Sequence, residues 1–328
     1  MNTEIKQLNT KADNYSKILD KLTLEIKKTI VGQDIIIEKL LIALISQGHV
    51  LLEGVPGLAK TLMIKTMSDS LESSYTRMQF TPDLLPADII GTKIYNHKNV
   101  SFTTLKGPIF KNFILADEIN RAPPKVQSAL LEAMQEKQIT IQGETFILEK
   151  PFLVMATQNP IESEGTYKLP EAQVDRFMFK LLIDYPNKED EIEIINRFTQ
   201  GEKIKTNKVL SKKQIIEMQQ FTHKVYADDK VKEYVATIVD ATRQPEKYKL
   251  DIKEYIEYGA SPRASLWLII AAKAHALVKG RGYIKPEDVI AIAHDVLRHR
   301  ILLTYEAEAE GIKEDDIIDK IIGKIRAP

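Results

Sequence analysis

The residues best suited to chemistry lie between 54 and 61, where a short apolar run enters a loop with two glycines that ends in Lys60 and Thr61. The residues that follow, 62–67, have the pattern of a helix. A strand, a glycine-rich loop and a helix N-terminus in this order form a concavity of backbone N–H groups that binds anions. In such a loop Lys60 would reach the outer phosphates of a nucleotide, and the Thr61 hydroxyl would bind Mg²⁺. One residue departs from the usual pattern, because Ala59 stands where a glycine precedes the lysine.

Two adjacent carboxylates, Asp117 and Glu118, follow the apolar run 113–116. Ligands of open α/β sheets bind outside the carboxyl ends of the strands, which is where this pair would lie. Asp117 can hold Mg²⁺ through its water shell, since this ion keeps several waters and takes few protein ligands. Glu118 can polarise a water for in-line attack on a γ-phosphoryl group. The alternative is a polar strand end that leads into a turn.

Three further polar residues extend this set. Asn159 follows the apolar run 152–156, where its amide could bind the attacking water or a γ-phosphate oxygen, although Asn-Pro is also a turn signal. Arg176 ends a short helix expected at 169–176. Arg263 lies in the first turn of a long alanine-rich helix that begins at Pro262, where a cation opposes the helix dipole unless an outside anion binds it. For both arginines the alternative is a solvated or salt-bridged surface position.

The elements that must position these residues read as an α/β fold. Buried strands are expected at 49–53, 75–80, 113–118, 152–158 and 177–183, separated by helices, which indicates a parallel sheet covered on both faces. Two hairpins are expected, at 93–103 and 139–148. From about 186–190 the chain reads as successive helices with no strand. We therefore divide it into residues 1–188, an N-terminal helix and nucleotide-binding core, and residues 189–328, a helical domain.

Composition narrows the class of protein. The 328 residues contain 46 Lys and Arg against 46 Asp and Glu, without the basic excess expected of a protein that grips nucleic acid along its length. The absence of cysteine excludes disulfides, thiolate zinc sites and cysteine nucleophiles. The six histidines show no metal-ligand spacing. No apolar run approaches bilayer length and the N-terminus is polar, so we expect a soluble cytoplasmic protein without membrane insertion.

In this order the motifs resemble those of AAA+ ATPases, and the exact residues within them are similar to those of the MoxR subfamily. The resemblance is carried by residues 54–61, 79–86, 116–123, 156–160, 169–177 and 261–264, and it extends from Ile30 to about Arg300. The alanine at position 59 is shared by the MoxR pattern.

The resemblance implies a P-loop AAA+ αβα core with a parallel five-stranded sheet and two hairpin insertions, plus an all-α lid domain. It implies that ATP and Mg²⁺ bind between core and lid, in a homo-oligomer that is usually a ring of six. By position, Asn159 matches sensor 1, Arg176 matches the arginine finger that reaches a neighbour's nucleotide, and Arg263 matches sensor 2. Lys60 and Thr61 match the Walker A pair, and Asp117 and Glu118 the Walker B pair. The residues implied at the nucleotide are Ile30, Val31, Gly32, Gly54, Val55, Pro56, Gly57, Leu58, Ala59, Lys60, Thr61, Leu62 and Asp117, with Thr61 and Asp117 at Mg²⁺.

The function implied is that of an ATP-hydrolysing chaperone that remodels or matures a client protein. In relatives this role is thought to include metal or cofactor insertion, often with a partner that contains a von Willebrand factor A domain. Two alternatives stay open: a nucleic-acid motor, disfavoured by the neutral charge, and an ATP-gated scaffold that assembles but hydrolyses little.

Overall fold

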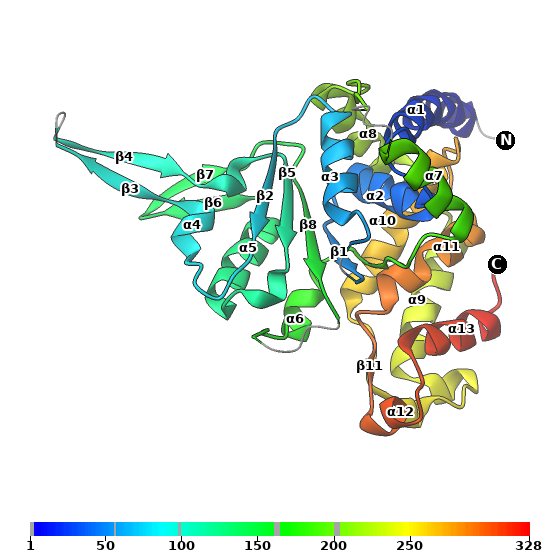
Figure 1. Ribbon diagram of the computed structural model, residues 1–328. Helices are drawn as coiled ribbons and strands as arrows, with labels where there is room; N and C mark the ends of the chain where they lie inside the picture. The colour runs from blue at the N-terminus through cyan, green and yellow to red at the C-terminus, as the bar shows by residue number, and fades with distance from the viewer. Residues whose placement is uncertain (1–2, 56, 98–99, 161–164, 200–203) are drawn as a thin grey trace.

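A parallel sheet forms the centre of the computed structural model, which describes residues 3–55, 57–97, 100–160, 165–199 and 204–328. Its five strands run in the order β2-β5-β8-β1-β9, and every neighbouring pair is parallel (Figure 1). Their bounds are β1 Val50–Glu53, β2 Tyr75–Gln79, β5 Phe113–Asp117, β8 Leu153–Gln158 and β9 Phe179–Leu182. The parallel five-stranded sheet predicted from the continuous apolar runs is confirmed.

The strands are apolar on both faces because helices cover both faces. Along β5, Phe113 and Leu115 belong to one hydrophobic core, whereas Ile114 and Ala116 belong to the other. The first core includes residues of helices α2 (Asp34–Ser46) and α3 (Lys60–Asp69), and the second includes those of α5 (Pro124–Glu136). Side chains that alternate between two cores explain why these strands lack the polar alternation of a half-exposed sheet.

Both predicted hairpins are present. The first is β3 (Gly91–Asn96) with β4 (Ser101–Lys106), which follows the short helix α4 (Pro86–Ile90) and extends away from the body of the molecule (Figure 1). The second is β6 (Gln138–Ile141) with β7 (Glu144–Ile147), between α5 and β8. The first hairpin exposes a large apolar surface, with Phe102 69% exposed.

The C-terminal part of the chain is helical, as predicted. Its helices are α7 Lys188–Phe198, α8 Lys212–Lys224, α9 Asp229–Arg243, α10 Pro262–Val278, α11 Pro286–Leu297, α12 Tyr305–Ala309 and α13 Glu314–Lys324. It also contains a small antiparallel sheet, β10 (Ile256–Tyr258) with β11 (Leu302–Leu303), where the sequence predicts no strand. Strands of three and two residues are too short to show a two-residue periodicity, which is why the pattern misses them.

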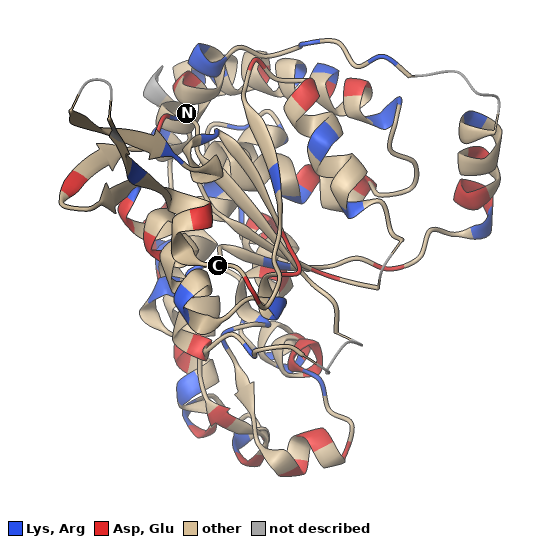
Figure 2. Ribbon diagram, turned by 60° about the vertical axis from the view of Figure 1, so that its left-hand side comes forward, with Lys and Arg blue, Asp and Glu red and all other residues tan. Residues whose placement is uncertain are grey.

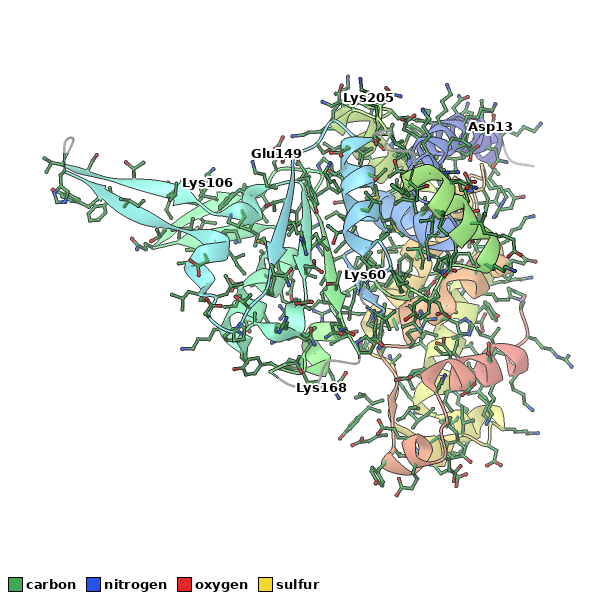
Figure 3. All side chains as sticks on the ribbon, viewed as in Figure 1. Asp13, Lys60, Lys106, Glu149, Lys168 and Lys205 are labelled. Atoms are coloured by element: carbon green, nitrogen blue, oxygen red, sulfur yellow. The ribbon has the colours of Figure 1, made fainter. Side chains whose placement is uncertain are left out.

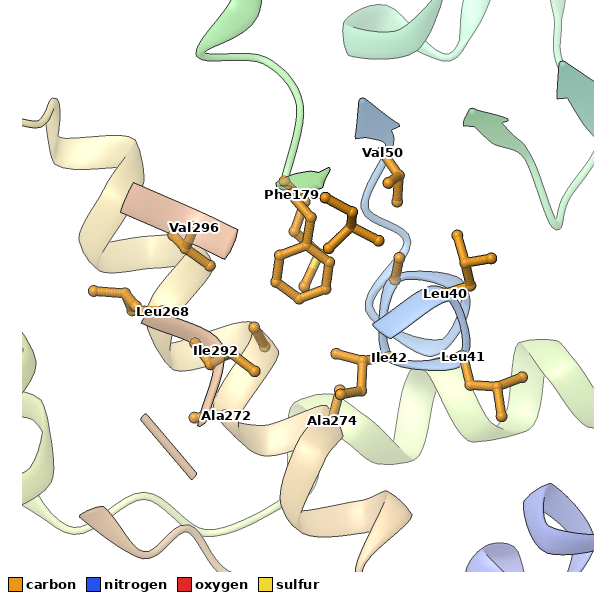
Figure 4. Close-up of a cluster of buried hydrophobic side chains, with 14 of the residues drawn as sticks. Leu40, Leu41, Ile42, Val50, Phe179, Leu268, Ala272, Ala274, Ile292 and Val296 are labelled. Carbon is orange, nitrogen blue, oxygen red and sulfur yellow. The ribbon is translucent and has the colours of Figure 1, made fainter. Parts of the chain in front are cut away.

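The core and the helical lid share one hydrophobic interior. Helix α2 contacts α10 and α8 of the lid, and the N-terminal helix α1 (Thr3–Lys27) contacts α10 as well. Figure 4 shows Ile42 of α2 in a cluster with Val50 and Phe179 of the sheet and with Leu268 and Ile292 of the lid. The buried Lys39 adds an ion pair to Asp295 of α11, at 2.9 Å. This continuous interior fixes the lid against the sheet at α2.

Basic and acidic residues are interspersed over the helices (Figure 2), in keeping with the neutral net charge. Within the described ranges, no helix is both long enough and apolar enough to cross a membrane.

Candidate functional site

The loop between β1 and α3 has the backbone that a phosphate-binding loop requires. A Cβ at Gly54 would lie 2.6 Å from the Ile183 carbonyl oxygen, so only glycine fits against the neighbouring strand end. Ala59, the residue that departs from the usual pattern, adopts a left-handed backbone with φ +54°, a conformation that favours glycine. Holding alanine there costs roughly 1–2 kcal/mol. Pro56 lies outside the described residues.

Lys60 is the first residue of α3 and lies next to the loop that precedes it (Figure 3). Its Nζ donates to the Gly54 carbonyl oxygen at 2.5 Å. Burial lowers the pKa of Lys60, while the nearby carboxylates of Asp117 and Glu118 act to raise it. A half-buried cation at a helix N-terminus, with a backbone carbonyl as its partner, is suited to bind phosphate.

Asp117 ends β5 and is held on both carboxylate oxygens. Thr157 of β8 donates its hydroxyl to Oδ1 at 2.6 Å, and Arg77 of β2 donates to Oδ2 from Nε at 2.9 Å and from Nη2 at 2.6 Å. Arg77 is half exposed, so its ion pair contributes little stability but fixes the carboxylate in place. The strands on either side of β5 therefore orient Asp117.

Glu118 leaves the strand in a left-handed conformation, with φ +56°. Such strained backbone concentrates at functional sites, where the surrounding contacts enforce it. Those contacts are visible here: Gln79 donates to Glu118 Oε2 at 2.7 Å, and Arg121 donates to the same oxygen at 3.0 Å. The Glu118 N–H also donates to Thr157 Oγ1 at 2.9 Å, so one threonine contacts both acidic residues.

These side chains line a single cavity of about 400 Å³, named here the phosphate cavity. Its wall includes Lys60, Thr61, Asp117, Glu118 and the buried Asn159, together with Gly57, Leu58, Ala59, Leu62, Arg77, Thr157 and Gln158. The structure thus brings together the sequence candidates from three separate segments. The Thr61 hydroxyl and the Asp117 carboxylate offer the hard oxygen donors that Mg²⁺ prefers, so the residues present fit this ion. Gly54 and Val55 precede the cavity wall and shape the loop.

A second, apolar pocket of about 230 Å³ adjoins the loop. Ile30 and Val31 line it, with Leu58, Ala59 and Leu62 of the loop and with Pro186, Ile194 and Phe198 from the start of the C-terminal part. Pockets that hold flat aromatic ligands have this apolar lining. Gly32 lies just outside it in a left-handed turn, φ +73°, where a Cβ would lie 2.3 Å from the Asp190 carboxylate.

Arg176 and Arg263 lie elsewhere. They line a pocket of about 290 Å³, named here the arginine pocket, together with Gln47, His49, Lys137 and Trp267 among others. His49 precedes β1 and Arg176 precedes β9, so this pocket is at the amino ends of those strands, opposite the phosphate cavity. From His49 to Gly54 an extended chain advances roughly 16 Å. Arg263 therefore lies at the opposite end of β1 from the phosphate cavity of its own chain.

Asp175, beside this pocket, binds Arg263 of the pocket and the neighbouring Arg300. Its carboxylate accepts from the fully buried Arg300 at 2.8 Å, from Arg263 at 3.2 Å and from the Ser261 hydroxyl at 2.9 Å. Arg300 donates in addition to the backbone carbonyl oxygens of Asp175 and Phe177, which flank Arg176. The anion that Arg263 needs at its helix N-terminus is therefore supplied partly by the protein itself.

Comparison with known proteins agrees with this geometry. Residues 49–179 match the ATPase family associated with various cellular activities (AAA), and residues 249–321 match the AAA lid domain. The chain is 50% identical to the chaperone MoxR1 of Mycobacterium tuberculosis, over 94% of this chain and 82% of the relative. The chain belongs to the MoxR family of AAA+ ATPases. It is also 32% identical to the protein MoxR of Paracoccus denitrificans, over 91% of this chain and 93% of that protein.

The solved structures include a close match to this MoxR-family protein. A crystal structure of a presumed ATPase from Cytophaga hutchinsonii aligns with a TM-score of 0.93 at 48% identity, and each chain is fully covered. The uncharacterised protein YeaC of Bacillus subtilis is 45% identical over 96% of this chain and 97% of its own length.

Sequence reasoning misses several residues that the MoxR-family structure places at these sites. Arg77 and Gln79 are two apart on β2, so they share a face, and a strand neighbouring β5 brings them to Asp117 and Glu118. That signal is present in the sequence once the strand order is known. No such local signal marks Ile194 and Phe198 of the apolar pocket, or Asp175 beside the arginine pocket.

Proposed function

We propose that this MoxR-family protein is an ATP-hydrolysing chaperone that works as a ring of identical subunits. The observation that carries the proposal is the separation of two complementary sites. Residues suited to bind and cleave a nucleotide line the phosphate cavity, whereas Arg176 and Arg263 line the arginine pocket at the other end of β1. Arginines that cannot reach their own chain's phosphates can reach those of a neighbour packed head to tail, and head-to-tail contacts that close generate rings.

In this proposal each residue has one task. ATP places its base in the apolar pocket and its phosphates along the loop, where Lys60 turns from the Gly54 carbonyl to the outer phosphates. Thr61 and Asp117 would hold Mg²⁺, which would neutralise charge on the phosphates. Glu118 accepts the proton of the attacking water, and because Gln79 and Arg121 both bind Oε2, we assign the accepting atom to Oε1.

Two further residues complete the site. Asn159 donates its amide to the attacking water or to a γ-phosphate oxygen. Arg176 of the neighbouring subunit stabilises the charge that develops on the transferred group, a contribution of about 10³ to 10⁵ in turnover. We keep residues 1–188 as the nucleotide-binding core and 189–328 as the lid, which supplies Arg263 to the same neighbouring site.

Steady-state ATP turnover of the purified protein tests this proposal. We expect turnover that rises steeply with subunit concentration, and its loss in Lys60→Ala and Glu118→Gln. Arg176→Ala should bind ATP but hydrolyse it at least 10³-fold more slowly. Mixing Arg176→Ala with Glu118→Gln subunits should restore part of the turnover. In the mixed ring, some interfaces join the intact Glu118 of one variant to the intact Arg176 of the other. Wild-type protein that forms a ring without turnover would leave the ATP-gated scaffold as the better description.

For the client we propose a protein rather than nucleic acid. The interspersed charges (Figure 2) differ from the basic stripe of a nucleic-acid motor, and the β3–β4 hairpin exposes the apolar side chains of Phe102 and Leu105. The resemblance to MoxR proteins makes a partner with a von Willebrand factor A domain, and metal or cofactor insertion into it, the first candidates. A pull-down from the native cell with Glu118→Gln, which should retain ATP, tests this. Strong salt-dependent DNA binding would favour the motor instead.

A further inference from the structure

The arginine pocket contains a third cation besides Arg176 and Arg263. Lys137 is the residue at the C-cap of α5, and it lines the same pocket as both arginines. We propose that Lys137 contacts the phosphates of the ATP bound by the neighbouring subunit, beside the two arginines. This inference rests on the proposed function, because it requires a neighbour that carries ATP.

The surroundings of Lys137 favour an anion that the subunit does not supply. Its Nζ donates to the side-chain oxygen of Gln47 at 3.2 Å, a neutral acceptor. Burial lowers the pKa of Lys137, and the positive charge of Lys150 lowers it further. Burial, a neutral amide as its partner and a nearby like charge all disfavour the charged form of this lysine. An incoming anion would offset that free-energy cost.

The arginine pocket as a whole also has more positive than negative charge. Of its described lining residues none is Asp or Glu, and the nearby Asp175 is already shared by Arg300 and Arg263. Arg176 adds to this, because its Nε is buried and lacks a hydrogen-bond partner among the described residues. Of the three cations only Arg263 pairs with a carboxylate among the described residues, that of Asp175. The excess positive charge suits a ligand with several negative charges, and a triphosphate is such a ligand.

The backbone conformation of Lys137 permits a substitution that removes the charge without disturbing the fold. Its φ is +53°, in the left-handed region that glycine and asparagine tolerate better than lysine. Lys137→Asn should therefore remove the cation without loss of fold. The chain offers a matched control in Lys249, an exposed lysine of the lid with φ +55°, so Lys249→Asn removes a lysine from the same backbone conformation away from the pocket.

We expect Lys137→Asn to lower the kcat for ATP hydrolysis about 10- to 100-fold, the range of a charge-assisted hydrogen bond, with ATP affinity of the single subunit unchanged. Lys137→Arg should recover most of the turnover, and Lys249→Asn should match wild type. An equimolar mixture of Lys137→Asn and Glu118→Gln should regain up to about a quarter of wild-type turnover, because about one interface in four then joins an intact Glu118 to an intact Lys137. Recovery in the mixture would show that Lys137 acts across the interface, which a purely structural role cannot produce.

A second readout does not depend on hydrolysis. Trp267 is the chain's one tryptophan and it lines the arginine pocket, so its fluorescence reports on what enters there. In Glu118→Gln protein with ATP, we expect the emission to change as subunit concentration rises. Adding Lys137→Asn should move the midpoint to about 10-fold higher concentration.

The outcomes separate the two proposals. Wild-type protein without turnover in an assembled ring contradicts the proposed hydrolysis, and the Trp267 titration still decides the role of Lys137. If wild type hydrolyses ATP but Lys137→Asn matches Lys249→Asn in turnover and in the Trp267 midpoint, the inference is wrong. A slower Lys137→Asn without recovery in the mixture would place Lys137 in its own subunit's chemistry and would also overturn it.

Discussion

Asp175 lies beside the arginine pocket and pairs with both Arg300 and Arg263, so Asp175→Asn tests how much these pairs stabilise the fold. The variant keeps the shape of the side chain but removes the charge between Arg300 and Arg263. Arg300 is fully buried, and breaking a buried pair by removing one partner costs about 3–5 kcal/mol. The pair with the more exposed Arg263 adds less than about 1 kcal/mol. Because Arg300 keeps its bonds to backbone carbonyls, we expect about 3 kcal/mol in all.

The assay is urea unfolding followed by circular dichroism at pH 7, with Asp251→Asn, an exposed carboxylate of the lid, as control. At a slope of about 3 kcal/mol/M, the loss corresponds to a midpoint lower by about 1 M. ATP turnover should fall at least 10-fold as well, since the backbone that carries Arg176 is no longer fixed by Arg300. An Asp175→Asn midpoint within about 0.3 M of the Asp251→Asn midpoint would refute this reasoning.

Thr157→Val removes a hydroxyl that donates to Asp117 and accepts from the Glu118 N–H, so ATP turnover should fall about 10- to 100-fold and stability by about 1–3 kcal/mol; unchanged turnover would contradict it. Burial lowers the pKa of His49 from its ordinary 6.5 to about 4, so its neutral form stabilises the fold above pH 6.5. About 3 kcal/mol of that stability should be lost as the pH falls from 6.5 to 4, seen as a steeper acid dependence of unfolding than in His49→Gln. Gly54→Ala should lower stability by about 1–3 kcal/mol, whereas Gly323→Ala, an open site in a helix, should raise it by about 1 kcal/mol in the same unfolding assay.

Much of the phosphate cavity is predictable because its parts are local. Each strand ends in its own polar residue, and the carboxyl ends of parallel strands meet at one edge of a sheet. Asp117 and Asn159 therefore fall at the same edge of the sheet as soon as β5 and β8 are recognised as parallel strands, and the order of the sheet makes them neighbours. Lys60 and Thr61 follow from the strand, loop and helix that precede them. None of these placements depends on a contact between distant side chains.

The arginine pocket is different because it is built from distant contacts. Asp175 meets Arg300 across 125 residues, and because both lie just beyond the ends of helices, no periodicity in the sequence predicts that pair. From sequence, Arg263 was expected to need an anion from outside, and the structure supplies part of it from Asp175. The left-handed conformations of Ala59 and Glu118 are not predictable from the sequence either, because alanine and glutamate rarely adopt the positive φ that glycine adopts readily.

The two sites are the two ends of one short strand. β1 leads from His49, at the wall of the arginine pocket, to Gly54, at the start of the phosphate loop, and it is bonded to β8 on one side and β9 on the other. A strand held on both sides moves with its sheet rather than bending alone. In a head-to-tail ring, the end that receives a neighbour's phosphates would thus be rigidly tied to the end that binds the subunit's own. Coupling between successive sites would then need no long pathway, because the central strand of each subunit already spans the distance.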